Sequence, residues 1–339
     1  MKWSRNAPPA AVNGRRREGR ASVPCAAPID DGPFASRSPA GFALRSPRGG
    51  HRLLRPQPST RLYTLHALET GRFALDGGAM FGVVPRPLWE KRIAPDARNR
   101  IPLAMRCLLA EGDGRLVLID TGLGHKYDAR FAELYAVDHE SATLERSLAA
   151  AGFSPGDVTD VILTHLHFDH CGGCTRRVQD RLALAFPRAR HHVQAAHWAW
   201  ANAPNPRERP SFLAENLAPL ESEGVLVFHD GPGEILPGIA ARTFDGHTEA
   251  QQVLLVDGRA GTVAYCADLV PTSHHLAAAW TMGYDIRPLV TMDEKARFLA
   301  EAARERWALF FEHDPTVEVA TAVETERGVA VTDARRVNE

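Results

Sequence analysis

Short apolar runs separated by glycine-containing turns fill the chain from about residue 60 onward. Polar and apolar positions alternate over residues 61–68, as in a β-strand with one buried face. Residues 103–109 and 116–119 are apolar runs on either side of Glu-Gly-Asp-Gly at residues 111–114, which predicts a hairpin of two strands. Residues 142–151 have the pattern of a helix.

The same organisation continues in the second half of the chain. Four further strands are predicted, at residues 225–228, 239–243, 252–256 and 262–267. The third of these ends in a turn at Asp257-Gly258. A long helix is predicted over residues 292–307, with Glu294 and Arg297 exposed and Phe298 facing inward. Strands and helices thus interleave in two halves of similar size, which predicts a mixed α/β fold.

The most informative segment is residues 164–170, Thr-His-Leu-His-Phe-Asp-His, which directly follows a strand-like apolar run. In an extended segment His165 and His167 point the same way, so both can reach one cation. Asp169 and His170 lie where the chain turns and can face a second cation nearby. A lone histidine is more often an ordinary surface or core residue, but four ligand-type residues at this spacing predict a metal site.

Four residues cannot complete two coordination shells, so further ligands are expected downstream. His247 lies in a glycine-containing turn after the predicted strand at residues 239–243. Asp268 follows the predicted strand at residues 262–267, and His313 follows an apolar run. All three therefore sit at the ends of hydrophobic strands, where a sheet presents side chains rigidly.

Together these residues resemble the ligand pattern of the metallo-β-lactamase superfamily, His-x-His-x-Asp-His followed by His, Asp and His at strand ends. The resemblance covers roughly residues 60 to 320 and includes the apolar strand that ends in Asp120-Thr121-Gly122. It implies an α/β fold of four layers, an αβ/βα sandwich, with the metals at the sheet edges between the two halves. The domain would occupy residues 59–339.

The resemblance also implies a complete set of metal ligands for two divalent ions. The first metal would be bound by His165, His167 and His247, the second by Asp169, His170 and His313, and Asp268 would bridge them. Asp120 would then be a carboxylate that holds a ligand histidine in its orientation.

Nitrogen and oxygen ligands without thiolate suit Zn²⁺ as the default ion, and also Mn²⁺, Fe or Co²⁺. Two such cations about 3.5–4 Å apart lower the pKa of a shared water, polarise a carbonyl and stabilise the oxyanion formed on attack. Asp169 can also orient the resulting hydroxide, and Asp268 sets the metal spacing. No convincing nucleophile elbow is present in the sequence. The expected reaction is therefore metal-assisted hydrolysis.

The substrate class is predicted from finer similarities. Bridging Asp268 resembles the hydrolase branches of the superfamily more than true β-lactamases, and residues 76–85 and 268–273 look most like quorum-quenching lactonases. This implies opening of a lactone ring like that of an acyl-homoserine lactone, by a hydroxide that bridges the metals. Two segments depart from that group. Residues 247–251 are His-Thr-Glu-Ala-Gln instead of His-Thr-Pro-Gly-His, and Pro271 replaces a common tyrosine, so Tyr284 is the candidate proton donor to the leaving alkoxide.

Other functions stay open at this point. The same fold could carry a thioesterase, a phosphodiesterase or phosphotriesterase, or an iron-dependent oxygenase. A non-catalytic binding protein is a further alternative. The complete ligand set argues against lost activity, and the oxygenase relatives generally use fewer ligands.

Several other large or ligand-type residues have ordinary structural explanations beside functional ones. Large apolar residues more often belong to the core, but five of them could form a pocket for an acyl chain. These five are Met80, Phe81, Trp89, Trp280 and Tyr284. His274 and His275 are expected at the surface or next to the ligands.

Composition adds limits on partners and location. The chain of 339 residues has a formal net charge of −1, which gives no electrostatic reason to expect nucleic acid or an anionic membrane as a partner. No apolar run approaches the about 18 residues that span a bilayer, and no secretory signal is recognised. We therefore expect a cytoplasmic enzyme whose partner is a small-molecule ester or lactone, with a homodimer left open.

The five cysteines, an odd number, lack a disulfide-framework pattern and are expected as reduced thiols. Cys171 and Cys174 form a Cys-x-x-Cys, which can be a redox or zinc motif. We expect instead that its small residues and two glycines let the chain turn tightly beneath the metals and enter a helix.

Residues 1–58 differ in composition from the rest, with eleven Lys or Arg, three Asp or Glu and nine Pro. They are predicted to be a disordered extension. A transit segment, or twin-arginine export suggested by Arg15-Arg16-Arg17, is the alternative, but neither an amphipathic helix nor an adequate apolar region accompanies it.

Deletion of residues 1–58 should leave both fold and hydrolysis intact, because this segment lacks the apolar periodicity that offsets the entropy of ordering. The measurements are the melting temperature and the turnover of the truncated chain beside the full chain. A large drop in either would show that the extension packs on the domain.

Overall fold

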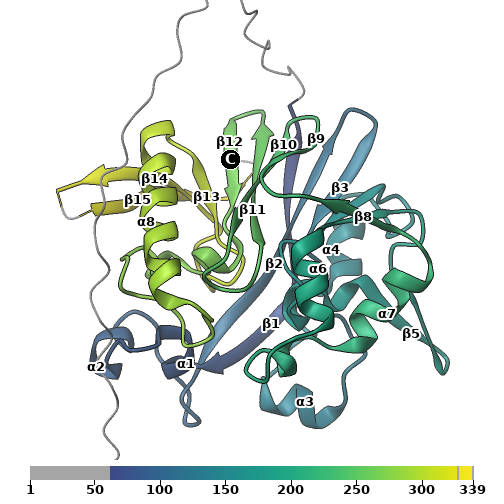
Figure 1. The fold of residues 1–339 in the computed structure, drawn as a ribbon, viewed down its shortest axis with the longest axis horizontal. Coiled ribbons are helices and arrows are strands. Elements are labelled where there is room, and N and C mark those ends of the chain that lie inside the picture. Colours follow the sequence, from purple (N-terminus) through teal and green to yellow (C-terminus); the bar gives the residue numbers. More distant parts are fainter. Residues whose placement is uncertain (1–61, 327, 338–339) are drawn as a thin grey trace, which may run out of the picture. The chain divides into compact units, whose positions relative to one another are not determined.

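The computed structural model describes residues 62–326 and 328–337, and the predicted disordered extension at residues 1–58 lies outside them. The described strands form two large sheets and one small hairpin (Figure 1). The first sheet has the strand order β1 (Thr64–Asp76), β2 (Arg100–Gly112), β3 (Arg115–Ile119), β4 (Asp160–Ile162), β7 (Arg190–Gln194), β8 (Leu226–His229). The second has the order β15 (Gly328–Arg335), β14 (Val319–Thr325), β13 (Ala308–Phe310), β12 (Gly261–Tyr265), β11 (Gln251–Gly258), β10 (Ile239–Phe244), β9 (Gly233–Leu236). The hairpin is β5 (Thr175–Val178) and β6 (Arg181–Leu184).

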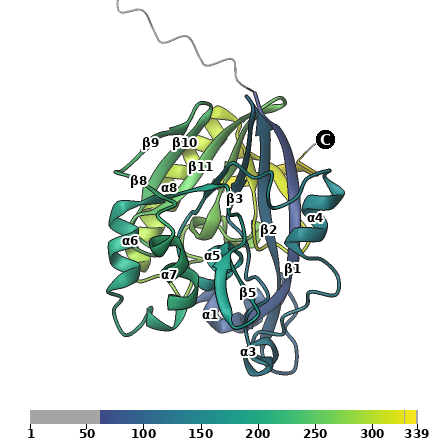
Figure 2. The same ribbon diagram turned by 90° about the vertical axis from the view of Figure 1, so that its right-hand side faces the viewer.

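Helices connect these strands; the longer ones cover the outer faces of the sheets, and others lie at one end of the sandwich (Figure 1 and Figure 2). They are α1 (Gly77–Phe81), α2 (Arg86–Trp89), α3 (Ala129–Leu134), α4 (Leu144–Ala150), α5 (Phe168–Cys171), α6 (Ala195–Asn202), α7 (Ala214–Ser222) and α8 (Pro288–Glu305). Four short 3₁₀ turns are η1 (Gly172–Cys174), η2 (Arg209–Ser211), η3 (Ala267–Leu269) and η4 (Ser273–His275). Within the described residues no helix is both long and apolar enough to cross a membrane.

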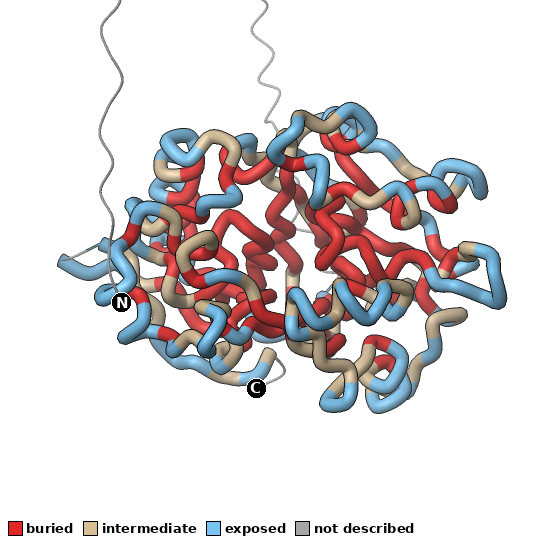
Figure 3. Tube along the Cα trace, turned by 90° about the horizontal axis from the view of Figure 1, so that it is seen from below, coloured by how far each residue is buried: buried red, intermediate tan, exposed pale blue. Residues whose placement is uncertain are grey.

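The central strands are apolar on both faces because the middle of each large sheet is buried on both sides. On β3, Val117 and Ile119 join the apolar layer between the sheets, while Leu116 and Leu118 pack with α4 on the outer side. On β12, Tyr265 faces the layer between the sheets and Cys266, directly after the strand, lies in the outer core that includes α8 residues. Alternation along each strand thus builds three apolar layers, and Figure 3 shows the buried residues in red. The four-layer αβ/βα sandwich expected from the sequence is confirmed.

Most predicted elements are present with shifted ends. The hairpin of β2 and β3 is antiparallel as predicted, but β2 begins at Arg100, three residues before the apolar run. The strand predicted at residues 61–68 continues to Asp76 as β1, through a break in register between Glu69 and Arg72. Polar residues continue the strand here because pairing with β2 supplies their backbone hydrogen bonds.

The long helix near the C-terminus differs from the prediction in two ways. It begins earlier, at Pro288, and ends at Glu305, so that Trp307 lies outside it. Glu294 was predicted to be exposed and is buried, while Arg297 is exposed and Phe298 is buried as predicted. The reason is tertiary: the Glu294 carboxylate accepts the backbone N–H groups of Asp245 and Gly246, both at 2.9 Å.

The Cys-x-x-Cys lies at the end of α5, and the chain then passes through η1 into strand β5, not into a helix as predicted. Both thiols are buried and free. Burial raises the pKa of Cys174 to about 12, which disfavours the reactive thiolate. The glycines between them are required for close packing, because a Cβ on Gly173 would lie 2.2 Å from the carbonyl oxygen of Thr121.

Replacement of Glu294 by alanine should lower the free energy of unfolding by about 1–3 kcal/mol, since the buried N–H of Gly246 would lose its acceptor. Urea denaturation measures this change. The exposed Arg297→Ala on the same helix serves as control and should stay within about 0.5 kcal/mol of the wild type. Equal stability of the two variants would contradict the role given to Glu294.

Candidate metal centre

Four elements bring the predicted ligands to one place. The segment after β4 carries His165, His167, Asp169 and His170, the last two on α5. His247 lies on the loop between β10 and β11. Asp268 lies on η3 after β12, and His313 lies on the segment that follows β13. All seven side chains are buried. The predicted strand-end positions therefore meet at one edge of the sandwich.

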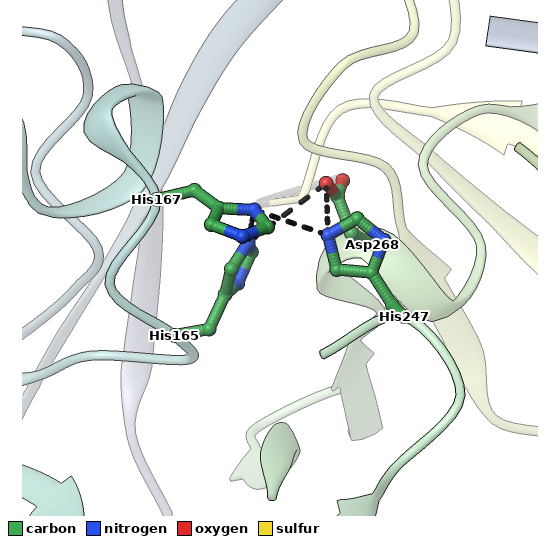
Figure 4. Close-up of side chains that lie close together, drawn as sticks. All are labelled: His165, His167, His247 and Asp268. Atoms are coloured by element: carbon green, nitrogen blue, oxygen red, sulfur yellow. Dashed lines mark hydrogen bonds and ion pairs between the residues drawn. The ribbon is translucent and has the colours of Figure 1, made fainter. Parts of the chain in front are cut away.

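The first group of donors consists of His165, His167, His247 and Asp268 (Figure 4). Nδ1 of His167 lies 3.1 Å from Nε2 of His165 and 3.2 Å from Nε2 of His247. Oδ2 of Asp268 lies 3.2 Å from Nε2 of His247 and 3.9 Å from Nε2 of His165. Three imidazole nitrogens and one carboxylate oxygen thus surround a single small volume.

The second group consists of Asp169, His170 and His313. Nε2 of His313 lies 3.2 Å from Nε2 of His170 and 3.8 Å from Oδ2 of Asp169. Asp268 reaches this group as well, with Oδ1 3.4 Å from Nε2 of His313 and Oδ2 3.6 Å from Nε2 of His170. It is therefore placed between the groups, as expected of a bridging carboxylate.

These distances fit metal ions. A tetrahedral ion bound at about 2.0–2.1 Å holds neighbouring donor atoms roughly 3.3 Å apart, close to the spacings above. Oδ1 of Asp268 is buried and accepts no hydrogen bond from the described residues. A buried anionic oxygen without a hydrogen bond is costly unless a cation satisfies it, so the residues present fit the two divalent ions that the sequence predicts.

Hydrogen bonds on the outer nitrogens fix the tautomers of four histidines. Nδ1–H of His247 donates to Asp285 at 2.9 Å, and that of His313 donates to the carbonyl oxygen of Ala104 at 2.9 Å. The Thr164 hydroxyl gives its proton to Asp120, so its oxygen accepts from Nδ1–H of His165 at 3.1 Å. Nδ1–H of His170 donates in the same way to the Asp120 carboxylate. In its neutral form each ring therefore directs an Nε2 lone pair at the cluster, as a metal ligand requires.

Asp120 has the orienting geometry that the resemblance implied. Its carboxylate accepts the backbone N–H of Thr164 at 2.8 Å and the Thr164 hydroxyl at 2.7 Å. It also accepts Nδ1–H of His170 at 3.2 Å. Asp120 itself has a positive φ of 56°, a conformation rare outside glycine. One buried carboxylate thus ties the end of β3 to the ligand loop.

Charge within the cluster follows from burial and from neighbouring groups. Burial lowers the pKa of His165 and His167, which keeps both rings neutral and able to coordinate. Burial alone would raise the pKa of Asp268, but His247 and His170 outweigh it and hold that pKa well below its ordinary value. Asp268 is therefore ionised.

Three carboxylates beside the ligands were not identified from the sequence. Asp285 holds His247, and Glu312 lies 3.1 Å from Nδ1 of His170. Burial raises the pKa of Glu312. Glu208 lies 3.8 Å from Nε2 of His167, the ring that presents Nδ1 to the cluster. Glu312 precedes a ligand in sequence, which could have suggested it. Asp285 and Glu208 lie in irregular segments that are distant in sequence from the histidines they contact, and no local sequence pattern identifies them.

Glu208 is held rigidly although it lies on a loop. Its carboxylate accepts the Thr248 hydroxyl at 2.7 Å, the indole N–H of Trp200 at 2.9 Å and the side-chain amide of Asn205 at 2.6 Å. Burial opposes its ionisation, but these donors and His167 lower its pKa to about 2. Glu208 therefore faces His167 as a fixed negative charge.

A cavity of about 290 Å³ opens beside both donor groups. Its apolar wall is contributed mainly by Leu75, Met80, Tyr135, Phe168 and Met282, and its polar side by Arg207, Glu208, Tyr284 and the clustered ligands. Tyr284 is 36% exposed, and burial of its ring in the wall raises the pKa of its hydroxyl. The hydroxyl is thus protonated at neutral pH.

Of the five residues predicted for an acyl pocket, Met80 and Tyr284 line this cavity. The other three form an aromatic core next to it. Phe81 stacks on Trp89 with ring centroids 5.5 Å apart and meets Trp280 edge-on at 5.6 Å. Sequence alone could not separate these roles, because core and pocket take the same residue types.

The two extra histidines have different positions. His275 is buried and does not lie at the surface. Its Nε2–H donates to the carbonyl oxygen of Met80 at 2.9 Å, and its ring stacks on Phe81 at 4.7 Å. It thereby fixes the position of α1 beside the cavity. His274 is half-buried.

Comparison with known proteins agrees with the fold. The family model of the metallo-beta-lactamase superfamily matches residues 102–313. A probable metallo-hydrolase of Mycobacterium tuberculosis is 30% identical over 217 residues, which cover 56% of this chain and 66% of that protein. The chain thus spans just under two thirds of that relative's own length. An N-acyl homoserine lactonase of Bacillus cereus is 25% identical over 244 residues, covering 69% of this chain and 87% of that one.

Solved structures give the same result. A probable metal-dependent hydrolase from Staphylococcus aureus is 27% identical with a TM-score of 0.73, covering 80% of this chain and 98% of that one. AidC, a dizinc quorum-quenching lactonase, shares the fold at 21% identity and a TM-score of 0.66, covering 83% and 100% of the respective chains. The chain belongs to the metallo-β-lactamase superfamily. Its fold is that of the metal-dependent hydrolases to which it is similar, and it is an enzyme of this superfamily.

Purified protein should hold about two metal ions per chain, because seven donors with one shared carboxylate suffice for two sites. Elemental analysis after expression with ample metal measures this. The variant His66→Ala, outside the cluster, should keep both ions and serves as the control. A wild-type content of one ion or none would contradict the two-site assignment.

Proposed function

We propose that this protein is a metal-dependent hydrolase that opens the ring of an acylated lactone. The observation that carries the proposal is the cavity of about 290 Å³, which has the donor groups on one side and an apolar wall on the other. A substrate with a reactive carbonyl and an apolar acyl chain fits such a site. The Bacillus relatives named as N-acyl homoserine lactonases support the lactone as the reacting group.

The metal ions, when bound, would supply an activated water and polarise the carbonyl. Nitrogen and oxygen donors without thiolate suit zinc, and zinc is the ion we propose. The protein's own part begins with holding these ions through the seven proposed ligands. Asp169, at the cavity surface, is placed to accept a hydrogen bond from the attacking water and so orient it.

Ring opening adds one water across the bond between the carbonyl carbon and the ring oxygen. The ring oxygen leaves as an alkoxide and needs a proton. The Tyr284 hydroxyl lies on the polar side of the cavity and is protonated at neutral pH, so we propose it as the donor. Pro271, which stands at the position of the usual tyrosine, is buried and has no proton to give.

The other departure from the lactonase pattern, at residues 247–251, is accommodated by other contacts. Glu249, which replaces the usual proline, pairs with Arg287 at 2.7 Å, and its carbonyl oxygen accepts Nδ1–H of His197 at 2.6 Å. Ala250 has a positive φ of 51° where the pattern has glycine. The turn after His247 is therefore held by other contacts, and His247 keeps its place in the cluster.

Asp268→Ala should reduce lactone turnover by roughly 10²-fold or more, because metal spacing and the position of the attacking water fail together. Tyr284→Phe should cost much less, and its loss should fall on kcat if the hydroxyl donates to the leaving group. The exposed Asp180→Ala is the matched control and should change nothing. Mass spectrometry of a lactone panel reads ring opening as the gain of one water.

The same panel should include thioesters and phosphodiesters. Protein with both metals bound that opens no lactone but hydrolyses either of these would contradict the lactonase proposal. The assignment to a dinuclear metal-dependent hydrolase would then stand alone.

A further inference from the structure

A second cavity, of about 190 Å³, lies behind the ligand loop and shares no lining residue with the first. It is enclosed by the segment after β3, by the start of α4 and by the β5–β6 hairpin; α4 and β5 can be located in Figure 2. Its lining combines basic side chains with apolar ones. The basic ones are His125, Lys126, Arg176 and Arg177.

Lys126 is the central observation. Its side chain is half-buried, and its ammonium group donates to the carbonyl oxygens of Gly172 and, at 3.4 Å, of Thr175. It also lies 5.1 Å from the ring centroid of Tyr127. These partners are neutral, and among the described residues no carboxylate lies within ion-pair distance of Lys126. A cation removed from water is normally paired with an anion, and here the open side of the cation is a cavity.

The other charges leave the cavity positive. Glu145, the carboxylate in the lining, lies 3.5 Å from Nε2 of His125. Arg177 pairs with Glu215 at 3.4 Å, while Arg176 is exposed and makes no ion pair with a described residue. Lys126 and Arg176 are thus both available to an anion. The basic side chains of the lining thus outnumber its one carboxylate, and this positive charge predicts a negatively charged ligand.

Part of the remaining wall is apolar. It is formed by Leu144, Pro155, Ala185 and Phe186, of which Leu144 and Phe186 belong to the buried core behind α4. Bare inorganic phosphate would leave this surface uncovered. We propose that the cavity binds a small organic carboxylate whose negative group meets Lys126 and Arg176 and whose short apolar chain covers Leu144 and Phe186.

Occupancy of this cavity is linked to the ligand loop through the backbone. Gly172, which accepts from Lys126, lies two residues after His170, and Gly173 donates to the carbonyl oxygen of Gly122 at 2.9 Å. Thr121, in the cavity wall, donates from its hydroxyl to the carbonyl oxygen of His170 at 3.0 Å. A bound carboxylate that fixes Lys126 therefore also stabilises the segment after His170.

Hexanoate is the probe, and its neutral isostere hexanamide is the matched ligand, both titrated by calorimetry into the metal-loaded full chain. A carboxylate can also bind at the metals, so the titration is repeated with Asp268→Ala, which damages that site but leaves the second cavity intact. Lys126→Met and Arg176→Gln remove the two proposed contacts, and Lys91→Met, an exposed lysine outside the cavity, is the control. Thermal melting verifies that each variant is folded.

We expect Asp268→Ala and Lys91→Met to keep the hexanoate site in the second cavity. Lys126→Met and Arg176→Gln should each weaken hexanoate binding at this site at least tenfold. Hexanamide should bind more weakly by a similar factor. Should Lys126→Met fail to fold, the Arg176→Gln comparison decides. Equal binding of hexanamide, tighter binding of inorganic phosphate, or loss of the site in Asp268→Ala alone would each overturn the proposal. Because the test reads binding and not turnover, its result is independent of the lactonase assignment.

Discussion

The metal centre depends on the apolar layer between the two sheets. Val117, Ile119 and Ile162 from the first sheet pack in one cluster with Tyr265 and Phe310 from the second. This contact holds the ends of β4, β12 and β13 at one edge, where their loops carry the ligands. The nitrogen and oxygen donors of the cluster lie 3.1–3.9 Å from one another, and such a concentration of buried polar groups costs free energy unless each has a partner. The sandwich supplies the rigidity that keeps these groups together.

Around the ligands, a ring of hydrogen bonds converts approximate proximity into defined chemistry. Asp120, Thr164, Asp285 and the carbonyl oxygen of Ala104 each bind an outer nitrogen of a histidine, so that Nε2 faces inward. Some of these partners come from segments far from their ligand in sequence, and their own positions depend on buried contacts. Glu294 is an example one step further out, because it holds the turn in front of His247. Residues that hold the ligands in this way are buried and polar themselves, as Asp120, Asp285 and Glu294 are.

The two cavities differ in the origin of their chemistry. The first takes its polarity from the ligand cluster and its apolar wall from α1 and neighbouring segments. The second owes its charge to Lys126, whose ammonium group lies against backbone carbonyls of the same turn that carries the Cys-x-x-Cys. The tight packing of Gly172 and Gly173 brings the two cavities close together, because a side chain on either glycine would collide with the loop after β3. The compact ligand turn thus forms a wall of both sites.

The sequence by itself determined the family, the four-layer architecture and the seven clustered residues, because a dense ligand motif and apolar strands are local patterns. It also indicated Asp120, whose place after an apolar strand is visible in the chain. Only the tertiary structure decided which polar and aromatic residues serve the site. Glu208 and Asp285 are recruited by contacts across the fold, Glu294 is buried by the backbone it caps, and Phe81 and Trp89 became core while Met80 became cavity wall. These outcomes depend on what packs opposite each side chain, and that information is spread over segments that lie from 38 to 195 residues apart.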